Sequence, residues 1–106
     1  MKVMQYDVYL NPRPQSKDIY PYVIDVQSDL LNFLQTRLTV PLKIHRSNVY
    51  APKNLTPIFN VWGKDLLLIP FLAPAIGKKN LKKSVCSLSQ HASEIISAML
   101  CSLSGR

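Results

Sequence analysis

Few residues of this chain could carry acid–base or nucleophilic chemistry, and the sequence does not group them. Asp25 and Asp29 stand four positions apart, but a strand followed by a turn would aim their carboxylates in different directions. His45 and His91 have no sequence neighbour resembling an acid that could orient an imidazole ring. The three glycines, at positions 63, 77 and 105, are too scattered for a phosphate-binding loop or a serine nucleophile elbow. These observations predict a binding protein rather than an enzyme.

The two cysteines do not suggest a metal site. Cys86 and Cys101 lie 15 residues apart with His91 between them, whereas a zinc site needs four ligands in paired clusters. In a cytosolic chain, cysteines of this kind are typically small buried apolar side chains. We therefore expect no metal and no other cofactor.

Positive charge is the clearest chemical signal, and it is unevenly distributed. The chain has 13 Lys and Arg and 6 Asp and Glu, which gives a net charge of +7. Residues 1–42 hold four basic and four acidic side chains, whereas residues 43–106 hold nine and two. The excess predicts a polyanionic partner, either a nucleic acid or an acidic protein, although it is also compatible with solubility alone. The densest cluster, expected to attract phosphates or carboxylates loosely, comprises Lys78, Lys79, Lys82 and Lys83.

The elements that must position these residues predict a small, mainly antiparallel β-sheet with a C-terminal helix, an α+β fold. In the first strand, period-two alternation places Val8 and Leu10 toward the core and Tyr9 toward solvent. In the third, Pro41 requires an edge or bulge position because it lacks a backbone donor. Gly63 leads the turn of a predicted hairpin, where it suits the first position of a type II′ turn. The five predicted strands span 3–10, 20–27, 37–42, 58–62 and 66–69.

The last segment changes to the period of a helix. Ser87 and Gln90 have the spacing of a capping box at its start. We expect a homodimer to form through the stripe near Met99 and Leu103 and the adjoining sheet edge. The apolar stripe comprises Leu88, Ala92, Ile95, Ile96, Met99, Leu100 and Leu103.

Length and composition predict one soluble cytoplasmic domain over residues 1–106. Apolar residues make up 47% of the chain, which excludes a disordered protein. The longest apolar run, 66–75, is shorter than the roughly 20 residues of a membrane span. The first ten residues carry Lys2, Gln5 and Asp7, so we expect no signal peptide.

The apolar segment at 29–34 fits neither a strand nor a capped helix. Its side chains either plug the end of the core or form an exposed patch for a partner. In the second case the anchors are Leu30, Leu31, Phe33 and Leu34.

Four stretches of the sequence resemble CcdB-type toxins, and together they cover essentially the whole chain. Residues 22–31 read YVIDVQSDLL where that family has V-D-V-Q-S-D-I-I, and residues 36–42 read TRLTVPL at the position of R-x-V-I-P-L. Residues 55–61, LTPIFNV, resemble the family strand L-x-P-V-V-x-I, and residues 85–89, VCSLS, enter a C-terminal helix.

This resemblance implies a dimeric, non-enzymatic toxin of a toxin–antitoxin module with a CcdB/MazF-like barrel-type fold. Such toxins bind the A subunit of DNA gyrase and trap its cleaved complex with DNA. An acidic antitoxin, CcdA, neutralises them by wrapping its disordered C-terminal part on the toxin. The apolar pair that the family uses at the gyrase surface corresponds to Leu30 and Leu31.

The resemblance is weakest at the terminal residues that are central to gyrase poisoning in the family. Family chains commonly end in Gly-Ile, often preceded by Trp. Gly105 matches, but Ser104 stands in place of the aromatic residue and Arg106 in place of the apolar one. Two alternatives therefore stay open beside gyrase poisoning: a diverged member that has lost it, and a MazF-like toxin that acts on nucleic acid through the lysine cluster. A purely structural dimer is a third.

Overall fold

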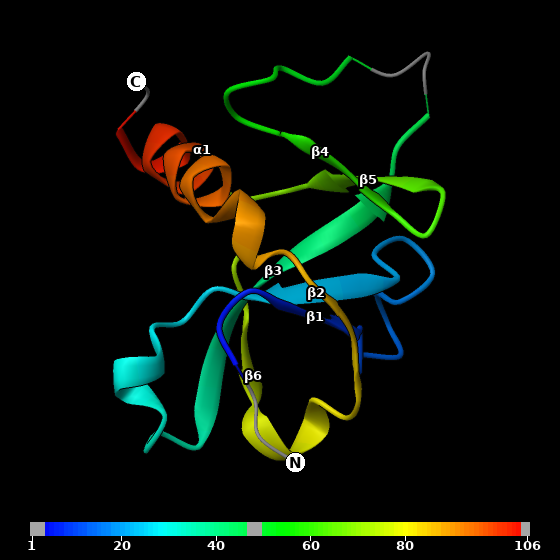
Figure 1. The fold of residues 1–106 in the computed structure, drawn as a ribbon. Coiled ribbons are helices and arrows are strands. Elements are labelled where there is room, and N and C mark those ends of the chain that lie inside the picture. Colours follow the sequence, from blue (N-terminus) through cyan, green and yellow to red (C-terminus); the bar gives the residue numbers. More distant parts are fainter. Residues whose placement is uncertain (1–3, 47–49, 105–106) are drawn as a thin grey trace.

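A curled antiparallel sheet, shaped as a half-barrel, carries one helix at the C-terminal end of the chain (Figure 1). This is the fold class that the sequence predicts. The structure is a computed structural model that describes residues 4–46 and 50–104, without the side chain of Ser104. Its elements are β1 (Asp7–Leu10), β2 (Tyr22–Asp25), β3 (Thr36–Ile44), β4 (Ile58–Val61), β5 (Lys64–Leu68), β6 (Ala75–Gly77), β7 (Ser84–Ser87) and α1 (Ala92–Ser104), with 3₁₀ turns η1 (Asp29–Leu31), η2 (Lys78–Asn80) and η3 (Ser89–His91).

Strand β3 is the centre of the sheet. The strand order is β4-β5-β3-β2-β1-β7, and β6 pairs with the other end of β3. Opposite β2, strand β5 pairs with residues 42–44 of β3, and β6 pairs with residues 36–38. Pro41 therefore lies between these two ladders. Its carbonyl accepts a hydrogen bond from the Ile69 amide at 3.1 Å. The missing proline N–H therefore interrupts neither ladder, although β3 is not an edge strand.

The sheet is covered on both faces, which corrects the prediction for the first strand. Tyr9, expected toward solvent, is 1% exposed, and Leu10, expected in the core, is 64% exposed. The reason is that β6 and η2 return over the second face and bury Tyr9 and Val23 with Ile76 and Leu81. The main core, on the first face, consists of Val8, Ile24, Val40, Leu42, Phe59, Val61, Leu66, Leu68, Leu88, Ile95 and Ala98.

The predicted hairpin is present as β4 and β5, but with a different turn. Val61 pairs with Lys64, so the loop consists of Trp62 and Gly63 alone. Their φ angles, +52° and +80°, are both positive, which is the signature of a type I′ turn rather than the predicted type II′. Strands β6 and β7 lie in segments that the sequence analysis did not assign to strands. Both are short, and neither shows a clear alternation of apolar and polar residues.

Helix α1 packs on the main core through Ile95 and Ala98, while Ile96 and Leu103 of the predicted stripe are exposed. The stripe therefore faces two directions. The predicted capping box does not form. The Ser87 hydroxyl accepts from the backbone amide of Ser89 at 3.2 Å, whereas a capping box would use the backbone amide of Gln90. In the described part of the chain, no helix has the length and apolar character needed to cross a membrane.

Candidate functional site

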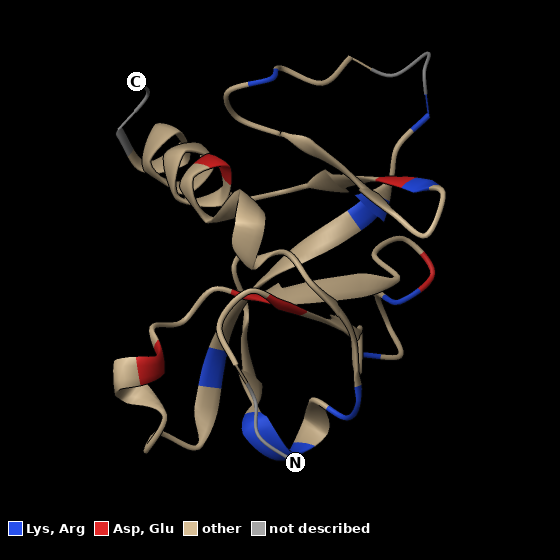
Figure 2. Ribbon diagram, in the orientation of Figure 1, with Lys and Arg blue, Asp and Glu red and all other residues tan. Residues whose placement is uncertain are grey.

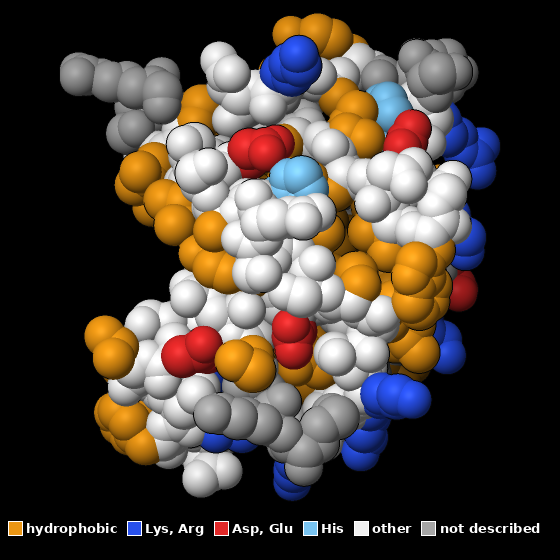
Figure 3. Space-filling model, viewed as in Figure 1, with side chains coloured by type: hydrophobic (Ala, Val, Ile, Leu, Met, Phe, Trp, Pro, Cys, Tyr) orange, Lys and Arg blue, Asp and Glu red, His pale blue; other side chains and the backbone are white. Residues whose placement is uncertain are grey.

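The apolar segment between β2 and β3 projects from the sheet as a ledge, which we define as residues 28–35. Leu30 is 88% exposed, Phe33 74% and Leu31 41%. The structure thus decides the alternative left open by the sequence, because these side chains do not plug the core of this chain. Figure 3 shows hydrophobic side chains gathered at the left edge of the molecule, over η1 below and over α1 above. The two groups are separate in this view, and clustered exposed apolar side chains of this kind mark interaction sites.

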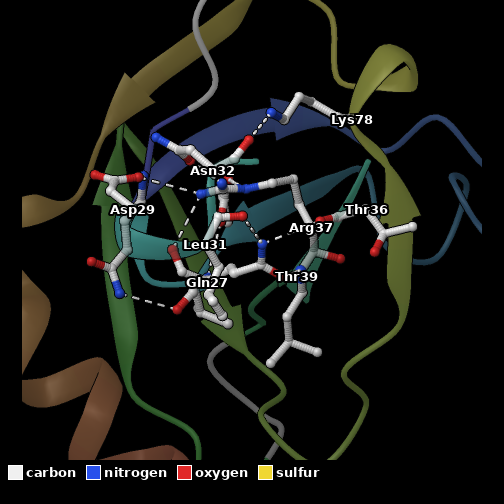
Figure 4. Close-up of polar contacts among 12 residues, drawn as sticks. Gln27, Asp29, Leu31, Asn32, Thr36, Arg37, Thr39 and Lys78 are labelled. Atoms are coloured by element: carbon white, nitrogen blue, oxygen red, sulfur yellow. Dashed lines mark hydrogen bonds and ion pairs between the residues drawn. The ribbon is translucent and has the colours of Figure 1, made fainter. Parts of the chain in front are cut away.

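A buried arginine supports the ledge from below. Arg37, on β3, has no exposed surface and directs its guanidinium under the ledge (Figure 4). Its Nε donates to Asp25 Oδ2 at 2.7 Å, and its Nη2 donates to Asp29 Oδ1 at 3.3 Å and to the Gln27 carbonyl at 3.2 Å. Its Nη1 donates to the Asn32 side-chain oxygen. One guanidinium therefore binds Asp25 of β2 and, within the ledge, both Asp29 and Asn32.

The convergence of Asp25 and Asp29 on one arginine corrects the expectation that their carboxylates would diverge. The prediction failed because it considered only the turn between them and not the partner on β3. Asp25 also accepts a hydrogen bond from the backbone amide of Gln27 at 3.0 Å, and Asp29 accepts one from the backbone amide of Gln5 at 2.9 Å. Burial raises the pKa of Asp25, since the bonds from Arg37 and Gln27 that favour the carboxylate only partly offset the loss of solvation. Both carboxylates are occupied by structural donors, so the pair is suited to support rather than to acid–base catalysis.

The rest of the ledge is held by backbone and side-chain hydrogen bonds. The Ser28 hydroxyl accepts from the Leu30 amide at 3.2 Å and caps η1. The side-chain Nε2 of Gln27 donates to the backbone carbonyls of Leu31 and Thr36, at 3.4 and 3.2 Å. Its side-chain Oε1 accepts from the backbone amide of Leu38 at 3.1 Å. The exposed apolar side chains therefore stand on a backbone with many fixed points.

The four clustered lysines do not form one surface. Lys78 is half-buried, and its Nζ donates to the Asn32 carbonyl of the ledge. Lys79, Lys82 and Lys83 are exposed. The predicted polyanion site is thus divided between one lysine that supports the ledge and three that face solvent.

The exposed lysines continue a basic edge of the molecule. Figure 2 shows Lys and Arg along the right and lower sides, where Asp and Glu are sparse. One hollow of about 500 Å³ on this edge is lined by Leu10, Lys82 and Lys83 among others. A second, also about 500 Å³, includes Lys43 and Arg46 with the single acidic residue Asp18. Cations beside apolar hollows suit an acidic, partly apolar partner.

The predicted dimer residues differ in exposure. Met99 is half-buried against the main core, whereas Leu103 is 82% exposed. Helix α1 lies on the same side of the molecule as η1 (Figure 1). Of the predicted terminal residues, Gly105 and Arg106 lie outside the described residues, as does the side chain of Ser104.

The expectation that His91 has no acidic sequence neighbour is wrong. His91 Nδ1 lies 2.9 Å from Glu94 Oε1, one helical turn along, and its ring packs on Phe59 with centroids 5.0 Å apart. The i, i+3 spacing of His91 and Glu94 could have indicated this pair. Cys86 and Cys101 are free and half-buried rather than fully buried. Among the described residues, no group of three or more His, Cys, Asp or Glu could hold a metal ion.

A family model described as CcdB protein matches residues 5–105, nearly the whole chain. A search of curated proteins gives no match.

Proposed function

Because the chain belongs to the CcdB family of toxins from toxin–antitoxin modules, we propose that it binds the A subunit of DNA gyrase and traps the cleaved gyrase–DNA complex. Members of this family are gyrase poisons and not enzymes. The role of the protein would therefore be to stabilise a complex in which the chemistry belongs to gyrase.

The observation that carries this proposal is the exposed apolar ledge on its buried polar support. Leu30 and Leu31, the pair suggested by the resemblance, are exposed rather than packed in the core. Burying Leu30, which is almost fully exposed, against a partner would contribute about 1.5–3 kcal/mol, whereas Leu31, only 41% exposed, would contribute about half of that or less. Because Arg37 and Gln27 already hold the backbone, little entropy would be lost on binding.

The basic edge fits the second partner, an acidic antitoxin of the CcdA type. The side chains of Lys79, Lys82 and Lys83 are exposed and make no ion pair with another described residue, and the adjacent hollow has an apolar wall at Leu10. An acidic segment bound here would be sensitive to ionic strength, since exposed charges are screened within about 8 Å at physiological salt. Both partners would be met in the cytoplasm.

Gyrase poisoning can be tested with purified protein, gyrase and supercoiled DNA. A trapped cleavage complex releases linear DNA once the proteins are denatured, so linear product is the expected result. Leu30→Gln should reduce it by more than about tenfold, as expected for an anchor at an interface centre. Leu72→Gln is the control, because Leu72 is also an exposed leucine but belongs to the connection between β5 and β6 and not to the ledge.

The same assay separates the alternatives. An intact dimer that yields no linear DNA, beside a responsive control toxin, would indicate a diverged member that has lost gyrase poisoning. RNA cleavage with binding that weakens steeply with salt would instead favour a toxin acting on nucleic acid. Expression without any effect on growth would favour a structural module.

A further inference from the structure

The tip of the ledge is held between two backbone carbonyls by a single residue. Phe33 and Leu34 form the tip, and they are flanked by Asn32 and Gln35. The Lys78 side-chain Nζ donates to the Asn32 carbonyl, and the Lys78 backbone amide donates to the Gln35 carbonyl at 2.7 Å. Lys78 thus bridges both ends of a two-residue apolar tip, across 46 residues of sequence. Figure 4 shows its contact with Asn32.

The Asn32 end of the tip is fixed a second time. Its side-chain oxygen accepts from Arg37 Nη1, while its backbone carbonyl accepts from Lys78 Nζ. Inside the ledge, the Leu34 amide donates to the Leu31 carbonyl at 3.0 Å. The turn that carries Phe33 is therefore linked to β3 through Arg37 and to η2 through Lys78.

This arrangement separates Lys78 from its neighbour Lys79. Both lie in η2 and carry the same charge, but Lys78 is half-buried and Lys79 is exposed. A general attraction of polyanions does not require one of them to bond to the ledge. Because the Phe33 side chain is 74% exposed, holding it in this position buries little apolar surface within the free chain.

We infer that Lys78 is a positioning residue, which presents Phe33 and Leu34 to the target as an extension of the surface formed by Leu30 and Leu31. The inference rests on the proposed function for the identity of the target. Holding the tip in one conformation lowers the entropy lost on binding, so its effect appears as affinity.

Amide hydrogen exchange tests the positioning without any partner. In Lys78→Met, which keeps the aliphatic stem but removes the donor, the Leu34 amide should exchange faster than in the unsubstituted protein. Lys79→Met removes the same charge from the same turn and should leave this rate unchanged. Lys78→Arg retains a donor and should restore most of the protection. Equal Leu34 exchange in Lys78→Met and Lys79→Met, at equal melting temperatures, would overturn the inference.

Affinity for the full-length gyrase A subunit tests the consequence. We expect Lys78→Met to weaken binding roughly three- to tenfold through lost preorganisation, with Lys79→Met close to unchanged. Phe33→Ala should weaken it by about tenfold or more, as for an aromatic anchor. Faster exchange in Lys78→Met with unaltered affinity, or unaltered affinity of Phe33→Ala, would overturn the presentation role. If the unsubstituted protein does not bind gyrase, the proposed target and the contact made by Phe33 both fail, while the exchange data still decide whether Lys78 holds the tip.

Discussion

Removal of the buried Arg37 guanidinium tests the account of the ledge most directly. In Arg37→Met, the side chain of Asp25 remains fully buried and keeps one of its two donors, the Gln27 amide at 3.0 Å. The Asn32 side-chain oxygen and the Gln27 carbonyl lose a donor as well. Breaking a buried ion pair from one side costs about 3–5 kcal/mol, because an uncompensated charge stays in the interior.

A second substitution distinguishes the buried charge from loss of packing. Asp25→Asn keeps an oxygen for the Gln27 amide but removes the negative charge. Added to Arg37→Met, it should recover about 1–2 kcal/mol of the loss, since an unpaired neutral group costs less than an unpaired charge. Asp29→Asn, whose carboxylate is 42% exposed, should cost less than about 1 kcal/mol and serves as the control.

The assay is urea unfolding at one fixed protein concentration, because the stability of the expected dimer would depend on concentration. It should be repeated between pH 5 and pH 7. The pKa of Asp25 is already raised by burial and should rise further without Arg37. A folded-state pKa above the unfolded value means that the folded state binds protons more readily, so the stability lost in Arg37→Met, relative to the unsubstituted protein, should be larger at pH 7 than at pH 5. A loss below about 1 kcal/mol, or no recovery on adding Asp25→Asn, would refute the reasoning.

Three further predictions concern other parts of the chain. Ser104→Trp with Arg106→Ile should increase growth inhibition if gyrase poisoning has been weakened at these positions, and unchanged inhibition would exclude that explanation. In a Cys101→Ser background, Cys86 should react more slowly with a disulfide reagent at pH 8 in the folded than in the urea-unfolded protein, because burial and then the charge of Asp7 raise the pKa of its thiol; equal rates would contradict this. Leu103→Glu should shift the protein from dimer to monomer in sedimentation at micromolar concentration, and an unaltered dimer would remove this part of α1 from the interface.

Local patterns in the sequence were sufficient for much of the fold. The alternation around Ile24 and Val40, the apolar runs on either side of Gly63 and the helical period of the last segment each predicted an element that the structure contains. These patterns are readable because strand and helix periods depend on residues close in sequence. The I-D-V-Q-S-D run at residues 24–29, read with the other three stretches, was similarly sufficient for the family, which the family model then showed.

Other features required the tertiary structure, since they depend on which distant segments meet. The burial of Tyr9 follows from β6 and η2 folding back over the sheet, and no pattern within the first strand contains that information. The split of the helix stripe, with Ile95 inward and Leu103 outward, likewise depends on how α1 lies on the core.

The candidate site shows the same division. Its exposed apolar residues could be named from the sequence, but not whether they were buried or exposed. Asp25 and Asp29 converge because both bind Arg37. Lys78 differs from the other clustered lysines because η2 folds against the ledge, where its side chain binds Asn32, 46 residues away in sequence. Sequence determined which side chains are available, whereas the tertiary structure decided their partners, because hydrogen bonds and ion pairs form between groups that are close in space and not along the chain.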